Sequence, residues 1–181
     1  HNGRRRQRQM CIRDRVMSHS KPFIAKEPHQ EPLGFPGELV DDWENVAIKK
    51  MADLQGKYRS LQVYLDSCVK CGACTDKCHY YVGTTDPKNM PVARQDLYRK
   101  VYRRYFTFAG KYFPKLVGAT DLTKEVLDDW YSYFHQCSQC RRCSVYCPYG
   151  IDTAEISMAA REVMDTIGVG QKLSLIHISE P

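Results

Sequence analysis

Residues 68–78 read CVKCGACTDKC, and residues 137–147 read CSQCRRCSVYC. The cysteines of both stretches follow one spacing, C-x2-C-x2-C-x3-C, with His79 after the first copy and Pro148 after the second. Eight of the nine cysteines lie in these two copies: Cys68, Cys71, Cys74, Cys78, Cys137, Cys140, Cys143 and Cys147. A catalytic cysteine needs its own paired base, so eight equivalent cysteines indicate a set of metal ligands instead.

This spacing is typical of proteins that bind two [4Fe–4S] clusters. In that pattern the fourth cysteine of each motif serves the cluster held by the other motif. Transferred to this chain, it predicts a first cluster on Cys68, Cys71, Cys74 and Cys147. It predicts a second cluster on Cys137, Cys140, Cys143 and Cys78. Because each cluster would join the two halves of the chain, we expect cluster binding to be coupled to folding.

Zinc and disulfides are the alternative uses of these cysteines. A zinc ion takes four ligands, usually as two C-x2-C pairs, and a third cysteine three residues further on is poor geometry for it. A zinc-bound interaction module without redox activity is therefore the alternative from another functional class. A disulfide framework is disfavoured because no apolar signal-peptide region is visible near residue 1.

The charge of the chain is concentrated at one end. The 181 residues carry a formal net charge of +6, to which residues 1–16 contribute +5, residues 17–172 only +2, and Glu180 −1. The basic balance therefore does not predict nucleic acid as a partner. Residues 1–16 show neither an apolar period nor helix caps, and residues 173–181 begin abruptly after Lys172 and stop without a terminal signal. We interpret both stretches as non-native tails. Native sequence is expected from about residue 17 to about residue 172, in a gene that continued further.

Apolar residues at helical spacing predict a mostly α-helical domain over residues 41–168, after an extended Pro- and Gly-rich arm over residues 17–40. Helices are expected at 41–56, from Pro91 onward, at 122–135 with Thr120 or Asp121 as the cap, and after a cap at Asp152 or Thr153. Residues 61–65 fit a short strand or the end of a helix. The stripe Leu97, Val101, Tyr105 and Phe108 should face the core, with Arg99 away from it.

The residues beside the cysteines suggest a backbone turn and a dry surrounding. Gly72 fits a position where backbone amides turn toward sulfide. An apolar shell is expected from Val69, Val82, Val145 and Ile151. His79 and His135 flank the motifs, and a capping or surface role is favoured over tuning of a cluster.

Two such motifs with 58 residues between them resemble the α-helical ferredoxin domain of heterodisulfide reductase-type iron–sulfur subunits. More narrowly, residues 58–106 (YRSLQVYLDSCVKCGACTDKCHYYVGTTDPKNMPVARQDLYRKVYRRYF) and residues 135–156 (HQCSQCRRCSVYCPYGIDTAEI) are similar to the K subunit of the membrane complex associated with dissimilatory sulfite reductase. The likeness covers about residues 17–172.

That resemblance implies a cytoplasmic subunit, peripheral at the inner face of the cytoplasmic membrane, with two [4Fe–4S] clusters. Electrons would pass between a quinone-reactive cytochrome b-type subunit and a small sulfur-carrier protein with reactive cysteines. In the family, sulfur chemistry is assigned to CCG segments, and this sequence has no CC pair. The chain is thus expected to be an N-terminal relay fragment. The runner-up is the iron–sulfur subunit of a glycolate or lactate oxidase-type dehydrogenase, where proline would follow both motifs.

Overall fold

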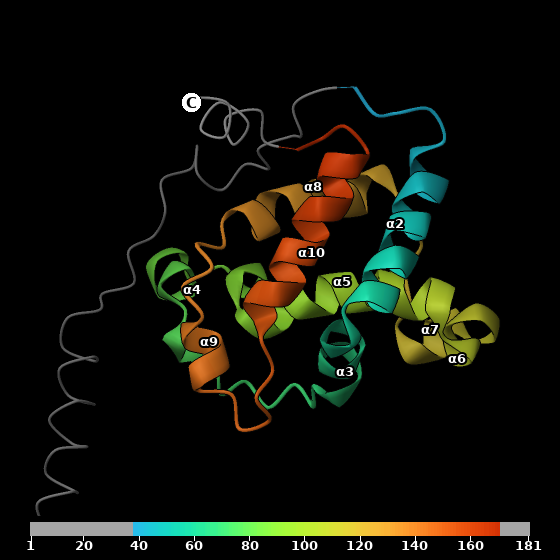
Figure 1. Cartoon of the computed structure of the whole chain (residues 1–181). Coiled ribbons are helices and arrows are strands. Elements are labelled where there is room, and N and C mark those ends of the chain that lie inside the picture. Colours follow the sequence, from blue (N-terminus) through green and yellow to red (C-terminus); the bar gives the residue numbers. More distant parts are fainter. Residues whose placement is uncertain (1–37, 171–181) are drawn as a thin grey trace, which may run out of the picture.

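Helix α10 (Thr153–Thr166) lies at the centre of the fold, where α2 (Trp43–Lys57), α5 (Pro91–Phe106) and α8 (Lys124–His135) pack against it (Figure 1). The computed structural model describes residues 38–170, and in this range it contains helices and no strand. The shorter elements, with η for 3-10 helices, are α3 (Arg59–Ser67), η2 (Thr75–Lys77), α4 (His79–Thr84), η3 (Pro87–Asn89), α6 (Phe108–Tyr112), α7 (Pro114–Val117) and α9 (Arg142–Val145). The predicted α-helical fold class is confirmed.

The described residues include the range 41–168, for which the sequence predicts the helical domain. The tails predicted at residues 1–16 and 173–181 lie outside the described residues, as does most of the arm predicted at 17–40. From residue 38 to residue 170, no helix combines the length and the hydropathy that crossing a bilayer requires.

An aromatic cluster on α5 and α8 fills the centre of the core. The rings of Tyr98 and Trp130 stack with their centroids 5.1 Å apart, and Trp130 meets Phe134 edge-on at 5.6 Å. All three side chains are fully buried. Stacked and edge-on arrangements suit aromatic rings because the negative ring face attracts the positive ring edge. Aliphatic side chains from α2, α3 and α10 complete this core: Met51, Leu54, Leu61, Leu65, Ile156, Val163 and Met164.

Helix ends follow local chemistry, with one shift from the predicted boundary. The Asp152 carboxylate accepts a hydrogen bond from the Ala154 amide at 2.9 Å and caps α10, as predicted. Helix α8 begins later than expected, because the Thr123 hydroxyl caps it by accepting from the Val126 amide at 3.4 Å. Asp121, one of the two predicted caps, is instead paired with Arg104.

Two predictions for the helix that begins at Pro91, here α5, are wrong: that Phe108 continues its core stripe, and that Arg99 lies away from the core. Helix α5 ends at Phe106, where the Thr107 hydroxyl accepts from the Gly110 amide at 3.2 Å and starts α6. Phe108 is therefore 75% exposed. Arg99, predicted to lie away from the core, is buried because the first cysteine loop covers that side of the helix.

The alternating residues 61–65 belong to helix α3. Leu61 and Leu65 are four residues apart and both fully buried, so they share one helical face against the core. Val63, between them, is exposed. All three alternating positions fit the period of a strand, and the first and third also fit the i, i+4 spacing of a helix, so the sequence could not decide between the two.

Gly110 allows α6 to fold back against the end of α5. A Cβ atom at this position would lie 1.8 Å from the backbone carbonyl oxygen of Arg103. We expect Gly110→Ala to lower the free energy of unfolding by about 1–3 kcal/mol, the usual cost of overpacking. At Gly56, inside α2, a Cβ atom would meet nothing within 4 Å. Gly56→Ala should therefore keep stability or raise it by up to about 1 kcal/mol.

Thermal unfolding followed by circular dichroism checks this pair of variants. The expected order of melting temperature is Gly56→Ala at or above the unsubstituted protein and Gly110→Ala below it. Equal melting temperatures for the two variants would contradict the close approach of α6 to α5.

Candidate metal centre: two cysteine-lined cavities

The two cysteine loops have left-handed residues at equivalent positions. Lys70 and Gln139, which precede the second cysteine of each loop, both have φ of 56°. Gly72 and Arg141, which follow that cysteine, have φ of 76° and 58°. Left-handed residues next to right-handed ones turn successive backbone N–H groups toward one side, a geometry that binds anions. Gly72 adopts this conformation as expected, whereas Arg141 takes it against the preference of a residue with a side chain.

The equivalence of the loops extends to the hydrogen bonds before their last cysteines. The Cys78 amide donates to the Thr75 carbonyl at 3.3 Å, and the Cys147 amide donates to the Ser144 carbonyl at 3.1 Å. The repeat in the cysteine spacing is thus partly a repeat of local structure, although the 3-10 helix η2 precedes Cys78 and the α-helix α9 precedes Cys147. In both loops this turn carries the fourth cysteine away from the first three.

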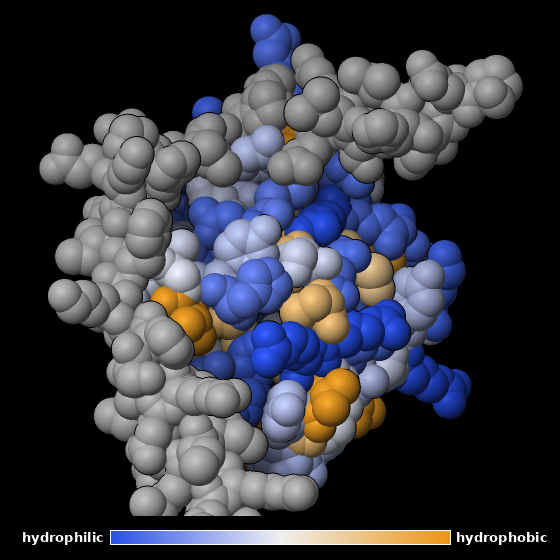
Figure 2. Space-filling view, turned by 90° about the vertical axis from the view of Figure 1, so that its left-hand side faces the viewer, coloured by the Kyte–Doolittle hydropathy of each residue, from blue (hydrophilic) through white to orange (hydrophobic). Residues whose placement is uncertain are grey.

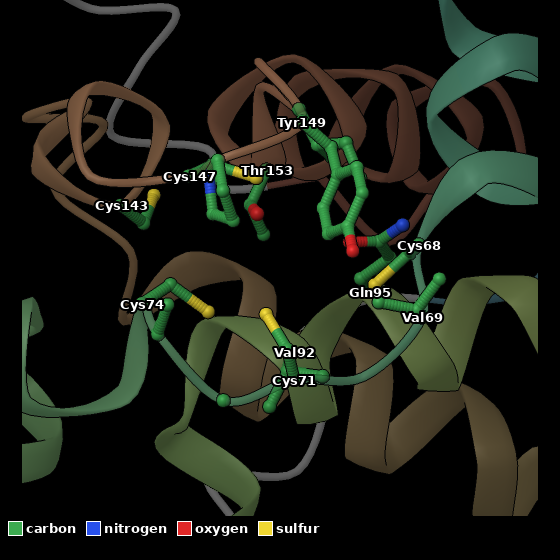
Figure 3. A pocket seen from close by; sticks show the side chains of 14 residues that line it. Cys68, Val69, Cys71, Cys74, Val92, Gln95, Cys143, Cys147, Tyr149 and Thr153 are labelled. Atoms are coloured by element: carbon green, nitrogen blue, oxygen red, sulfur yellow. The ribbon is translucent and has the colours of Figure 1, made fainter.

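The first cavity lies between the two loops (Figure 3). In the figure, the sulfur atoms of Cys71 and Cys74 point into the space from one side, and Cys147 and Thr153 lie on the opposite side. The non-atom space of the cavity, including the solvent at its open mouth, is about 360 Å³. Its lining includes Cys68, Cys71, Cys74, Cys147 and Cys143, with apolar walls from Val69, Val92, Ile151 and Tyr149.

The second cavity is lined by the opposite combination of cysteines and by cations. It measures about 350 Å³ including its mouth. It is lined by three cysteines of the second motif and the last cysteine of the first motif, which are Cys137, Cys140, Cys143 and Cys78. Its basic lining residues are Lys77, His79, Arg94, Arg141 and Arg142. Cys143 and Thr153 line both cavities, so the two spaces share a wall.

Burial differs among the thiols. Cys71 and Cys140, the second cysteine of each loop, are exposed, whereas Cys78 is buried. Burial raises the pKa of the Cys143 thiol to about 11, with a smaller contribution from neighbouring Cys137. Burial likewise raises the pKa of Cys74. These two thiols are therefore protonated at neutral pH in the metal-free chain, and a metal that binds them must displace protons.

The donor set fits a cluster better than a single ion. Within residues 38–170, no three or more His, Cys, Asp or Glu side chains converge on one point as ligands of a single metal ion would. The four thiols instead surround each cavity. In a [4Fe–4S] cluster each thiolate binds its own iron atom, so the ligands stand around a volume and not around a point.

Arginines behind the loops are site residues that the sequence did not reveal. The Arg99 guanidinium on α5 donates to the Cys68 carbonyl at 2.8 Å. Arg161 on α10 donates to the Cys137 carbonyl at 2.5 Å and to the Phe134 carbonyl at 2.6 Å. Burial lowers the pKa of both guanidinium groups. Each arginine therefore fixes the backbone at the start of one cysteine motif, yet neither forms an ion pair with a carboxylate of the described chain.

His79 lies at the edge of the second cavity. Its Nδ1 atom is 3.9 Å from the Cys140 sulfur, and its Nε2 atom is 3.3 Å from the Ser138 hydroxyl. The ring is exposed, which agrees with the surface position favoured from sequence. It nevertheless connects the end of the first motif to the start of the second.

The predicted apolar shell is only partly present. Ile151 is buried and Val69 lines the first cavity although it is 60% exposed, but Val82 and Val145 lie on the surface. These two belong to the short helices α4 and α9, whose outer sides face solvent. Figure 2 shows this side of the molecule as mostly hydrophilic, with small separate apolar patches. Adjacency to a cysteine in sequence did not predict which valines face the cavities.

Comparison with known proteins points to one kind of domain. Residues 64–151 match the family model of the 4Fe–4S dicluster domain. The chain is 52% identical over 141 residues to the Hdr-like menaquinol oxidoreductase iron-sulfur subunit 2 of Archaeoglobus fulgidus, covering 78% of this chain and 25% of that protein. The chain is also 49% identical over 141 residues to the Hdr-like menaquinol oxidoreductase iron-sulfur subunit of Archaeoglobus profundus, which again covers 78% of this chain and 25% of that protein.

A more distant relative has a related name. One component of the dihydromethanophenazine:CoB–CoM heterodisulfide reductase of Methanosarcina acetivorans is 28% identical over 106 residues, which are 59% of this chain and 25% of that protein. No solved structure shows a significant match to the chain. The chain thus spans about a quarter of the length of the curated relatives it matches.

The matched segment contains both cysteine motifs and most of the residues that line the two cavities. Two [4Fe–4S] clusters are the cofactors of such a domain, as the spacing predicted. Residues 64–151 are therefore a 4Fe–4S dicluster domain, built here on a ferredoxin-type fold of helices alone.

Proposed function

We propose that this chain relays electrons through two [4Fe–4S] clusters that are bound crosswise. The first cluster is held by Cys68, Cys71, Cys74 and Cys147, and the second by Cys137, Cys140, Cys143 and Cys78. The observation that supports this assignment is the lining of the two cavities. Each contains the first three cysteines of one motif and the last cysteine of the other, and Cys143 lines both.

The arrangement of the cavities favours transfer of electrons over chemistry on a substrate. The clusters supply one-electron redox chemistry, and the chain supplies their spacing and surroundings. The shared wall at Cys143 and Thr153 keeps the two sites adjacent. Cys71 opens the first cavity to solvent and Cys140 opens the second. An electron can thus enter beside one exposed cysteine and leave beside the other.

The relatives suggest the pathway to which this relay belongs. The two Archaeoglobus relatives are named as menaquinol oxidoreductase components, and the Methanosarcina relative as a heterodisulfide reductase component. We infer a heterodisulfide reductase-like complex in which electrons move between a quinone-reactive, cytochrome b-type membrane protein and the disulfide of a small sulfur carrier. The likeness of residues 58–106 and 135–156 to the K subunit supports a complex associated with sulfite reduction, with this chain peripheral at the inner face of the cytoplasmic membrane.

The alternatives receive less support. The relatives at 52% and 28% identity carry heterodisulfide reductase-type names, which favours that assignment over a glycolate or lactate oxidase-type subunit. A zinc-bound module would need four thiols around one point, and the thiols here surround cavities.

Serine variants of single cysteines test the two clusters. After anaerobic reconstitution, the unsubstituted chain should contain about eight iron and eight labile sulfide atoms. Cys74→Ser should lose or convert the first cluster, and Cys143→Ser mainly the second, because each removes one ligand. Electron paramagnetic resonance of the dithionite-reduced proteins should then show a different remaining signal in each variant.

Two results would contradict the proposal. A colourless protein with stoichiometric zinc and no sulfide would reject the clusters. Loss of both signals in a variant whose circular dichroism remains helical would reject their assignment to separate cysteine sets.

Purification from native membranes tests the proposed complex. A tagged chain should bring down a protein that contains haem b, because the quinone-reactive step is assigned to that partner. Addition of reduced menaquinone to the purified complex should bleach the broad cluster absorbance. A tagged chain that purifies alone from gently solubilised membranes, with clusters that menaquinol does not reduce, would contradict the pathway but not the clusters.

A further inference from the structure

Arg94 is a buried cation without a carboxylate counter-ion among residues 38–170. Its side chain on α5 is only 2% exposed. One guanidinium NH2 group donates to the Asn89 side-chain oxygen at 2.7 Å, and the Tyr80 ring lies 6.0 Å from the guanidinium carbon. The Nε–H group has no partner. No carboxylate of residues 38–170 forms an ion pair with Arg94.

Burial of this charge requires a compensating anion. An arginine remains protonated in proteins, and a buried ion without a partner costs several kcal/mol. The missing negative charge must therefore come from a group that the folded chain binds close to Arg94.

The remaining contact of Arg94 identifies where that anion lies. Its second NH2 group points at the Cys78 sulfur, with nitrogen and sulfur 3.7 Å apart, and Arg94 lines the second cavity. In the proposed assignment Cys78 is a ligand of the second cluster. A cluster with four thiolates is an anion that becomes more negative by one charge when it is reduced. A guanidinium at its ligand sulfur stabilises the reduced form more than the oxidised form.

The first cavity lacks such a contact. Its walls include Val92 and Ile151, and its α5 polar residue is the neutral Gln95, whose amide donates to the Tyr64 carbonyl. Arg99, the nearest equivalent of Arg94, donates to a backbone carbonyl of the first loop and not to a sulfur. Further polar contacts to cysteine sulfurs are those of the Val92 backbone with Cys74 and of the Thr153 side chain with Cys143, which bring no charge, and that of His79 with Cys140 in the second cavity.

We propose that Arg94, through its charge and its N–H···S contact with Cys78, raises the reduction potential of the second cluster above that of the first. This inference rests on the proposed cluster assignment. It gives the relay a direction: between the two clusters, the electron resides preferentially at the second, beside exposed Cys140 and the basic residues Arg141 and Arg142. Arg94 is a positioning and tuning residue, since it touches a ligand and not a substrate.

Redox titration of the reconstituted full chain, followed by electron paramagnetic resonance, tests this role. The signal that is missing from Cys143→Ser identifies the second cluster. In Arg94→Gln, reduction of the second cluster should become about tenfold less favourable, which lowers its midpoint potential by about 59 mV for one electron. Arg94→Lys keeps the charge and should show a smaller decrease. Arg99→Gln, which removes the same charge from the same helix, should leave the second midpoint unchanged.

Retention of both clusters with unchanged midpoints in Arg94→Gln would overturn the proposal, and so would a shift confined to the first cluster. If Arg94→Gln does not hold the second cluster, Asn89→Ala gives the same test, because it loosens Arg94 without removing it. In Asn89→Ala, reduction of the second cluster should become less favourable by less than tenfold, which lowers its midpoint potential by less than about 59 mV. An unchanged midpoint potential in this variant would overturn the proposal. Absence of either signal from the unsubstituted chain would instead be a failure of the cluster assignment itself.

Discussion

The meeting of two distant cysteine loops around shared cavities is the constraint on which this structure depends. The motifs are separated by 58 residues, yet the three leading cysteines of each face the last cysteine of the other. Helices α5 and α10 lie behind the loops and pack on each other through the core. The intervening helices thus set the positions of the eight thiols. Small changes in the packing of these helices would displace the thiols that line both cavities.

Charge explains why the loaded protein should be more stable than the metal-free chain. Arg94, Arg99 and Arg161 place cations behind the loops without carboxylate partners in the described range, and burial raises the pKa of Cys74 and Cys143. Neutral thiols cannot balance these cations, whereas thiolates bound to iron can. Under the proposed assignment, cluster binding therefore supplies folding free energy both through ligand bonds and through relief of unpaired buried charge.

The sequence predicted what local patterns encode. Apolar residues at helical spacing predicted the fold class, and cysteine spacing predicted the cofactor. The cap at Asp152 was found where side-chain chemistry places it. Arg94 and Arg99 were not found, because an amphipathic pattern assigns charged residues of a helix to solvent. Here a cysteine loop covers the polar side of α5 as well, and only the tertiary structure shows this. The exposure of Phe108 follows from a cap at Thr107 that breaks an otherwise continuous stripe.

The crosswise binding is tested most directly by the last cysteine of each motif. Cys147→Ser should perturb the same electron paramagnetic resonance signal as Cys74→Ser, and Cys78→Ser the same signal as Cys143→Ser. This grouping follows if each cluster takes its fourth thiolate from the other end of the chain. The opposite grouping, in which Cys78→Ser matches Cys74→Ser and Cys147→Ser matches Cys143→Ser, would show that each motif holds its own cluster and would contradict the account.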